Sequence, residues 1–299
     1  MKPYTIQWTV SEADSGILLR DFLKRNDISK KALTDIKFKG GLILVNGEEK
    51  TVRTVLNTND IVKVQFPSEI FSEDLVVEYI PFDIVYEDDF VLVINKPFGI
   101  PSIPSREHPK GTIANGLLYY FFQIGLQSTV HIVTRLDKDT SGLMLIAKNR
   151  FVHHLFSKNG LEHIQRKYLA FVHGQLEDSS GIIDAPIGRK DDSLIEREVR
   201  QDGQKAVTHF EVISFNEKYS FLRLQLETGR THQIRVHLSF IGHSLVGDDL
   251  YGGSVETLKR QSLHSYAIQF YHPFHQKNYL FEIGLPSDLA EWKSIHMPE

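Results

Sequence analysis

The chain of 299 residues contains no cysteine, and this absence excludes several kinds of chemistry together. Disulfide bonds, thiolate-bound metals and cysteine nucleophiles cannot form, and the composition fits a reducing compartment. The N-terminal residues MKPYTIQWTVSEADSG lack the apolar core of a secretion signal. No run of apolar residues approaches the roughly 18 that a membrane-spanning helix needs. We therefore expect a cytoplasmic protein that does not enter a membrane.

A large net charge is also missing, because the formal net charge is only −4. The content of 41% hydrophobic and 24% charged residues is that of a globular protein rather than a disordered or fibrous one. Basic residues exceed acidic ones by 7 − 3 = 4 between Arg20 and Lys39, whereas the segment from Glu69 to Asp89 has eight acidic residues and no Lys or Arg. One part of the surface could bind a polyanion that another part repels, although a solvated helix beside an acidic connector gives the same pattern.

The first 66 residues show the pattern of a separate small unit. An apolar stripe predicts a helix over residues 17–25, and a second helix is expected to begin at Ser29, whose hydroxyl can cap it. The segment LILVNGEE predicts a hairpin that turns at Asn46-Gly47, and residues 61–66 predict a closing strand.

This order of elements, together with the strings GLILVNGE and NTNDIVKV, resembles the small alpha-L RNA-binding module that is named after a ribosomal small-subunit protein. The resemblance implies that basic residues of the two helices contact RNA. These residues are Lys24, Arg25, Lys30, Lys31 and Lys37. A small packing domain with an incidental basic face is the alternative interpretation.

The acidic segment that follows predicts a linker, so we place the domain boundaries at 1–66, 67–85 and 86–299. In the last domain, short strand-like segments alternate with a few helices. The strand-like segments are 91–96, 143–147, 168–172, 221–227 and 279–283. Leucine alternates with polar residues in the fourth of these, so one face of that strand is expected to be buried. The mixture predicts an α+β fold, with a mostly antiparallel mixed sheet in the larger domain and a small N-terminal α/β domain.

The segment HIVTRLDKDTSGLMLIAKN, residues 131–149, has the densest group of polar side chains, and three interpretations compete for it. DKDTSG fits the first half of an EF-hand calcium loop, but Lys148 stands where that loop needs a bidentate acid. An aspartyl phosphatase would use Asp137 as nucleophile and Asp139 as acid, with magnesium. No buried apolar strand precedes these acids, however, and Arg135 would compete with magnesium for the carboxylate.

The third interpretation accounts for residues 80–290. RLDKDTSGL resembles the signature of the RluA-type pseudouridine synthases. Three further strings resemble other motifs of that family, in the family's order: NKPFGIPSIPS, RKYLAFVHG and LETGRTHQIRVHLSFIGHSLVGDDLYGG. The resemblance implies that residues 86–299 form a pseudouridine synthase catalytic domain acting on structured RNA, either ribosomal large-subunit RNA or tRNA. The N-terminal RNA-binding module favours ribosomal large-subunit RNA. One departure is Thr134, because many relatives have histidine at that position.

A helix is expected in the last of these strings. Thr231 can cap it, and Ile234, Leu238 and Ile241 would form its buried stripe. Arg235 lies one position off this stripe, in the first turns, from which its side chain can reach inward.

The same resemblance implies that Asp137 is the catalytic carboxylate and that Tyr168 and Arg235 act beside it. Arg235 would keep Asp137 ionised in a partly dry pocket, because burial alone favours the neutral acid. Tyr168 would stack on the target uracil or help to remove the proton from its carbon 5. Arg135 would hold the RNA when the target nucleotide flips out of its helix or loop.

Pseudouridine formation changes no oxidation state and releases no group, so it needs no cofactor, in keeping with the missing dinucleotide and P-loop fingerprints. We also expect no metal site, since the histidines occur without cysteine and without an H-E-x-x-H string. The histidines considered are His153, His154, His163, His173, His272 and His275. The expected partner is rRNA or tRNA, and the chain is expected to act as a monomer. A non-catalytic RNA-binding protein is the competing function.

Overall fold

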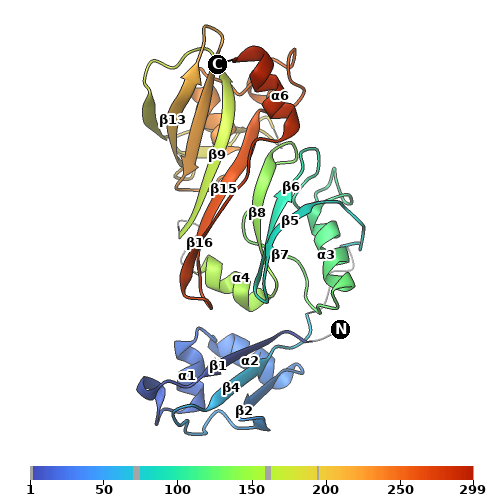
Figure 1. Ribbon diagram of the computed structural model, residues 1–299, viewed down its shortest axis with the longest axis vertical. Coiled ribbons are helices and arrows are strands. Elements are labelled where there is room, and N and C mark those ends of the chain that lie inside the picture. Colours follow the sequence, from blue (N-terminus) through green and yellow to red (C-terminus); the bar gives the residue numbers. More distant parts are fainter. Residues whose placement is uncertain (1–2, 70–74, 159–162, 194, 299) are drawn as a thin grey trace.

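The computed structural model describes residues 3–69, 75–158, 163–193 and 195–298, and it is elongated, with a small N-terminal unit at one end of a large sheet (Figure 1). The N-terminal unit has four strands in the order β1-β4-β2-β3, with two α-helices and a short 3-10 helix. Its elements are β1 (Thr5–Thr9), η1 (Glu12–Asp14), α1 (Leu19–Arg25), α2 (Lys30–Phe38), β2 (Leu42–Val45), β3 (Glu48–Glu49) and β4 (Ile61–Gln65).

The local signals of the N-terminal unit are confirmed. The Ser29 hydroxyl accepts a hydrogen bond from the N–H of Ala32 and so caps α2. Asn46 and Gly47 both have positive φ angles, 54° and 84°, as a tight hairpin turn requires. Helix α1 begins at Leu19 rather than residue 17, β4 ends at Gln65 rather than residue 66, and β1 was not predicted.

The larger sheet has ten strands, and its main path runs β10-β13-β14-β9-β15-β8-β6-β5, with β16 beside β15 and β7 beside β8. The bounds are β5 (Asp83–Glu87), β6 (Val91–Lys96), β7 (His131–Ile132), β8 (Ser141–Ala147), β9 (Ile164–His173), β10 (Ser180–Asp184), β13 (Val207–Phe215), β14 (Tyr219–Leu226), β15 (Leu263–His272) and β16 (Lys277–Glu282). Within the described residues, β15 and β8 are the one parallel pair of this sheet. The predicted α+β class with a mostly antiparallel mixed sheet is confirmed.

The close approach of β15 to β8 explains a glycine of the TSG string. Gly142 has a φ of 115°, and a Cβ atom there would collide with the carbonyl group of Ser265 on β15. A larger residue would therefore push apart the two strands in the middle of the sheet.

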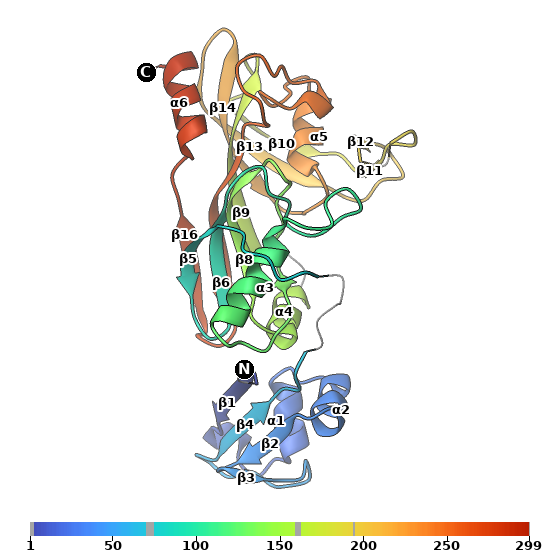
Figure 2. The ribbon, with the colours of Figure 1, turned by 90° about the vertical axis from the view of Figure 1, so that its right-hand side faces the viewer.

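Helices cover both faces of the large sheet, with α3 and α5 on one side and α6 on the other (Figure 2). The remaining elements are α3 (Ile113–Gln123), α4 (Arg150–Ser157), a β11–β12 hairpin (Ile187–Arg189 and Arg197–Val199), α5 (Gln233–Phe240), η3 (Asp249–Tyr251) and α6 (Ser287–His296). An apolar cluster lies on each face of the sheet, and successive side chains of β9 point into opposite clusters. Tyr168 and Ala170 pack in the cluster with α3 and α5, whereas Phe171 packs in the cluster with α6.

The N-terminal unit contacts the rest of the chain through Phe66, after its last strand, and Asp27, between its two helices. Phe66 stacks on Phe151 of α4 with ring centroids 5.3 Å apart, and Lys158 pairs with Asp27 at 2.7 Å. Strand β5 begins at Asp83, within the segment predicted as a linker, and joins the large sheet. The division into 1–66, 67–85 and 86–299 stays a prediction. Among the described residues, no helix combines the length and the apolar surface that crossing a bilayer demands.

Candidate active site

A cavity of about 430 Å³ opens where segments distant in sequence meet on the α3–α5 side of the large sheet. We call it the Asp137 cavity. It brings together the three residues predicted to be catalytic, and Arg135 lines it as well. Its charged and aromatic lining residues are Arg135, Asp137, Lys138, Arg166, Tyr168, Arg230, His232 and Arg235.

The loop before β8 positions Asp137. The buried hydroxyl of Thr134 accepts a hydrogen bond from the N–H of Leu145 at 2.9 Å, so the residue found in place of the family's histidine anchors this loop to β8. The N–H of Leu136 donates to the hydroxyl of Ser102 at 3.1 Å. Asp137 is thus flanked on its N-terminal side by two anchored residues.

Lys96 anchors the other side of the same loop. Its fully buried Nζ donates to the carbonyl oxygens of Pro97, Ile100 and Lys138 at 2.8, 2.8 and 2.9 Å. Burial lowers the pKa of Lys96 to about 7. Three acceptors match the three protons of an ammonium, so we assign the charged form. The NKPFG turn is thereby tied to the residue that follows Asp137.

Arg235 reaches from the first turn of α5 to Asp137, with Nη1 3.4 Å from Oδ2. Its closer partner is Asp248, a buried carboxylate whose two oxygens each lie 2.7 Å from the guanidinium. Burial works against the charge, but the hydrogen bonds and charge of Asp248, with the charge of Asp137, hold the pKa of Arg235 above its usual range. Arg235 therefore pairs with two carboxylates, Asp137 and Asp248, and the sequence did not predict the role of Asp248.

Tyr168 projects from β9 into the cavity and is buried. Burial raises its pKa; the nearby Arg166 opposes this rise and the charge of Asp137 adds to it. The phenol is therefore neutral near pH 7, and its ring offers a flat surface for stacking.

Arg166, on the same face of β9, was also missed by sequence analysis. Its buried guanidinium donates to the carbonyl oxygens of Ile164 and Thr228 at 3.2 and 3.3 Å. Within the described ranges, no carboxylate lies within 4.0 Å of it, and burial lowers its pKa. The wall of the cavity thus contains a cation beside the aromatic ring.

The helix that carries Arg235 begins differently from the prediction. Its N-cap residue is His232 rather than Thr231, and no side chain caps it. The side chain of Gln233 closes the preceding turn instead, because its Oε1 accepts from the N–H of Arg230 and the hydroxyl of Thr228. The predicted Thr231 cap is therefore wrong. His232 enters the cavity wall, a position that no local signal indicated.

The basic residues predicted to contact RNA from the N-terminal unit do not line the Asp137 cavity. All are exposed: Lys24, Arg25, Lys30, Lys31 and Lys37. Lys31 lines a second cavity of about 650 Å³, which Arg150 and His154 of α4 also line. Contact of these residues with RNA stays a prediction.

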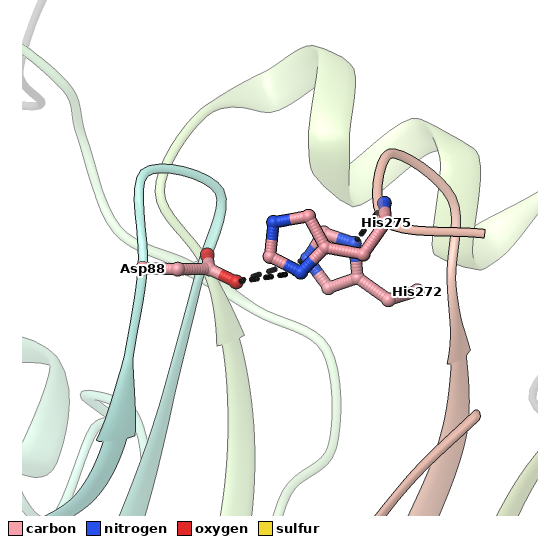
Figure 3. Close-up of side chains that lie close together, drawn as sticks. All are labelled: Asp88, His272 and His275. Atoms are coloured by element: carbon pink, nitrogen blue, oxygen red, sulfur yellow. Dashed lines mark hydrogen bonds and ion pairs between the residues drawn. The ribbon is translucent and has the colours of Figure 1, made fainter. Parts of the chain in front are cut away.

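Two of the histidines considered for metal binding lie beside a carboxylate (Figure 3). Asp88 Oδ2 is 3.1 Å from His272 Nε2 and 3.8 Å from His275 Nδ1. His272 Nδ1 accepts hydrogen bonds from the N–H groups of Phe274 and His275, so its ring proton belongs on Nε2 and faces Asp88. A metal at Nε2 would displace that proton and leave neither nitrogen protonated. The geometry fits a structural contact in which His272 and Asp88 join the β15–β16 turn to the β5–β6 turn.

Comparison with known proteins agrees with this geometry. Residues 90–240 match the family model described as RNA pseudouridylate synthase. The chain is 52% identical to the uncharacterized RNA pseudouridine synthase YjbO of Bacillus subtilis, over 91% of this chain and 97% of that protein. It is 40% identical to ribosomal large subunit pseudouridine synthase D of Yersinia pestis, over 71% and 70% of the two chains. The solved structure of human RNA pseudouridylate synthase domain containing 4 is similar, with a TM-score of 0.57, 25% identity, and coverage of 71% of this chain and 91% of that one.

Proposed function

Because the chain belongs to the RluA-type family of RNA pseudouridine synthases, isomerases that act on RNA, we propose that Asp137 is the essential carboxylate with which it converts specific uridines of structured RNA into pseudouridine. The observation that carries this proposal is the meeting of Asp137, Tyr168 and Arg235 in one cavity. These residues come from a loop, a strand and a helix that are far apart in sequence.

The reaction breaks the bond between N1 of uracil and C1′ of the sugar and joins C1′ to carbon 5. Carbon 5 loses a proton and N1 gains one, so the atoms balance without a further reactant. Asp137 is the one carboxylate among the described lining residues of the cavity. A glycosidase, in contrast, uses two carboxylates and a water. Three roles fit Asp137: attack on C1′, removal of the 2′ proton, or stabilisation of a sugar cation.

The surroundings of Asp137 contain a buried cation. Arg235 supplies a fixed positive charge 3.4 Å away, and Asp248 holds that guanidinium in place. Tyr168 can stack on uracil, and its hydroxyl can relay the proton of carbon 5 by taking it up while giving up its own proton. Arg166 lies on the same strand face and can bind an oxygen of the nucleotide.

The size of the cavity supports base flipping. A volume of about 430 Å³ suits a single nucleotide rather than a duplex, so the target would have to leave its helix or loop. Arg135 is exposed at the cavity, where it can hold a phosphate or fill the place that the nucleotide vacates.

We propose ribosomal large-subunit RNA as the substrate, with tRNA as the alternative. The relatives named ribosomal large subunit pseudouridine synthase D support this choice. In this proposal the exposed basic residues of the N-terminal unit bind RNA, and a cytoplasmic monomer acts without a cofactor.

The test is carbodiimide mapping of pseudouridine in total RNA from cells that lack the protein. We expect the signal to disappear at one or a few positions of large-subunit RNA and to return with the wild-type gene. A gene carrying Asp137→Asn should not restore it, whereas the neighbouring change Asp139→Asn should. An unaltered map would refute the proposal and favour a non-catalytic RNA-binding protein.

A further inference from the structure

His232 lines the Asp137 cavity with a backbone conformation that residues other than glycine rarely adopt. Its φ of 58° and ψ of 18° lie in the left-handed region. It stands between the turn after β14 and the first residue of α5, yet its side chain does not cap that helix. Only 12% of the side chain is exposed. The fold therefore uses an uncommon backbone geometry at a residue whose ring lies in the cavity wall.

The hydrogen bonds of Tyr251 indicate which nitrogen of His232 carries the proton. The Tyr251 hydroxyl accepts a hydrogen bond from the N–H of Arg197 at 2.9 Å and lies 2.8 Å from His232 Nδ1. Its own proton can be donated to Nδ1, and Nε2 faces the carboxylate oxygen of Asp137, so we assign the ring proton to Nε2. Burial lowers the pKa of His232 even though Asp137 opposes this effect. The ring is then neutral near pH 7 and has a single N–H.

That N–H and the guanidinium of Arg235 converge on one oxygen of the catalytic carboxylate. His232 Nε2 is 3.9 Å from Asp137 Oδ2, and Arg235 Nη1 is 3.4 Å from the same atom. No hydrogen bond from the described part of the chain engages Oδ1. Contacts between catalytic groups are often long in a free enzyme and shorten when the substrate binds. Two donors can thus restrain one oxygen and leave the other available.

We propose that His232 is a positioning residue that, together with Arg235, restrains Oδ2 of Asp137 and so presents Oδ1 to the sugar of the target uridine. Tyr251 supports this role by fixing the tautomer of His232. The inference rests on the proposed function, since it concerns the same carboxylate. Restraint increases the fraction of carboxylates in the reacting orientation. It therefore acts on the chemical step rather than on RNA binding.

Single-turnover kinetics test this inference. Enzyme in excess is mixed with RNA from cells that lack the protein, and conversion is followed at the uridine that the wild-type enzyme modifies. His232→Ala should lower the maximal rate constant roughly 100-fold, in the range found when one preorganised donor is removed. The enzyme concentration at half-maximal rate should change less than about twofold, because RNA binding is not affected.

A conservative variant separates positioning from a merely structural role. The side-chain amide of His232→Gln can place an N–H near the position of Nε2, so its rate constant should stay within roughly tenfold of the wild type. His209→Gln is the matched control, because His209 pairs with Glu227 outside the cavity. This control should leave the rate constant unchanged.

Tyr251→Phe tests the support of the ring. It keeps the aromatic ring against Arg235, whose Cζ lies 4.9 Å from the ring centroid, and removes the hydroxyl. As a single change, Tyr251→Phe should lower the maximal rate constant less than His232→Ala does. It should cause no further loss in a His232→Ala background, because the hydroxyl acts through His232.

Two results would overturn the inference. One is an unchanged maximal rate constant in His232→Ala, and the other is an equal loss in His232→Ala and His232→Gln, since a donor at this position would then have no effect. Failure of the wild-type enzyme to form pseudouridine in any RNA would instead refute the proposed function.

Discussion

The N-terminal unit and the Asp137 cavity both contain close pairs of opposite charge, but they hold these pairs in different surroundings. Arg25 and Asp14 lie 2.7 Å apart on the N-terminal unit, and the side chain of Arg25 is 57% exposed. Arg235 and Asp248 lie at the same distance beside the cavity, where their side chains are 8% and 0% exposed. The same contact distance therefore occurs once at the surface and once inside the protein, where the pair is also bidentate.

The difference concerns what each pair can do. An exposed pair contributes about 0–1 kcal/mol, because water and ions screen it. Breaking a buried pair leaves an uncompensated charge and costs about 3–5 kcal/mol. Charges of the N-terminal unit can thus be exchanged singly, whereas those of the cavity depend on one another. The predictions below follow this contrast from the largest expected effect to the smallest.

The carboxylate of the cavity should be indispensable. Asp137→Asn keeps the shape of the side chain but removes its charge, and we expect the single-turnover rate constant to fall by at least about 10³-fold. Asp139→Asn, two positions away, should stay within about tenfold of the wild type. Comparable losses in both variants would show that the loop as a whole, rather than Asp137, is needed.

The two ion pairs can be broken in parallel. Asp248→Ala should lower the free energy of unfolding by about 3–5 kcal/mol and also slow catalysis, because Arg235 is left buried with one distant partner. Asp14→Ala breaks the exposed pair with Arg25 and should change the free energy of unfolding by no more than about 1 kcal/mol. Urea denaturation measures both. Equal losses would remove the distinction between the two regions.

Changes to the basic residues of the N-terminal unit should affect RNA affinity and leave the chemical step unchanged. Lys30→Ala combined with Lys31→Ala should weaken RNA affinity roughly tenfold at low salt and reduce the dependence of affinity on salt. The rate constant at saturating enzyme should not change. Lysine-to-arginine replacements at both positions are the control and should retain affinity. A lower rate constant at saturation would instead connect this face to the chemical step.

Replacement of Glu69, which follows the N-terminal unit in the chain, should have the smallest effect, a change in how stability depends on pH. Burial opposes its charge, but the hydrogen bond and charge of His131, with the N–H groups of Arg150 and Thr129, hold its pKa below the usual 4.5. Because the folded pKa lies below the unfolded one, the carboxylate stabilises the fold above pH 4.5, and this contribution is lost as the pH falls further. The Tm of Glu69→Gln should therefore fall less on acidification than that of the wild type. Parallel curves would contradict this expectation.

The parts that could be predicted from the sequence are those that short-range chemistry or a long shared motif determines. The Ser29 cap and the Asn46-Gly47 turn depend on neighbouring residues, and the structure contains both. Four motifs in the family's order identified Asp137, Tyr168 and Arg235, which the fold places in one cavity.

The residues that were missed act through tertiary contacts. Asp248 and Tyr251 follow α5, and only the folding of that segment back onto the helix brings them to Arg235 and His232. The Thr231 cap was wrong because Gln233 closes the turn from inside the helix. Asp248 and Tyr251 lie within the quoted motif string of residues 226–253, but a string does not indicate which of its residues touch one another.

Strand β15 has a consequence for when the enzyme becomes competent. It lies between β9, which carries Tyr168, and β8, which follows Asp137, although it comes after both in the chain (Figure 1). During synthesis, the two halves of the sheet must remain unjoined until residues 263–272 have left the ribosome. An unfinished chain without these residues therefore lacks the strand that joins the Tyr168 strand to the Asp137 side of the sheet.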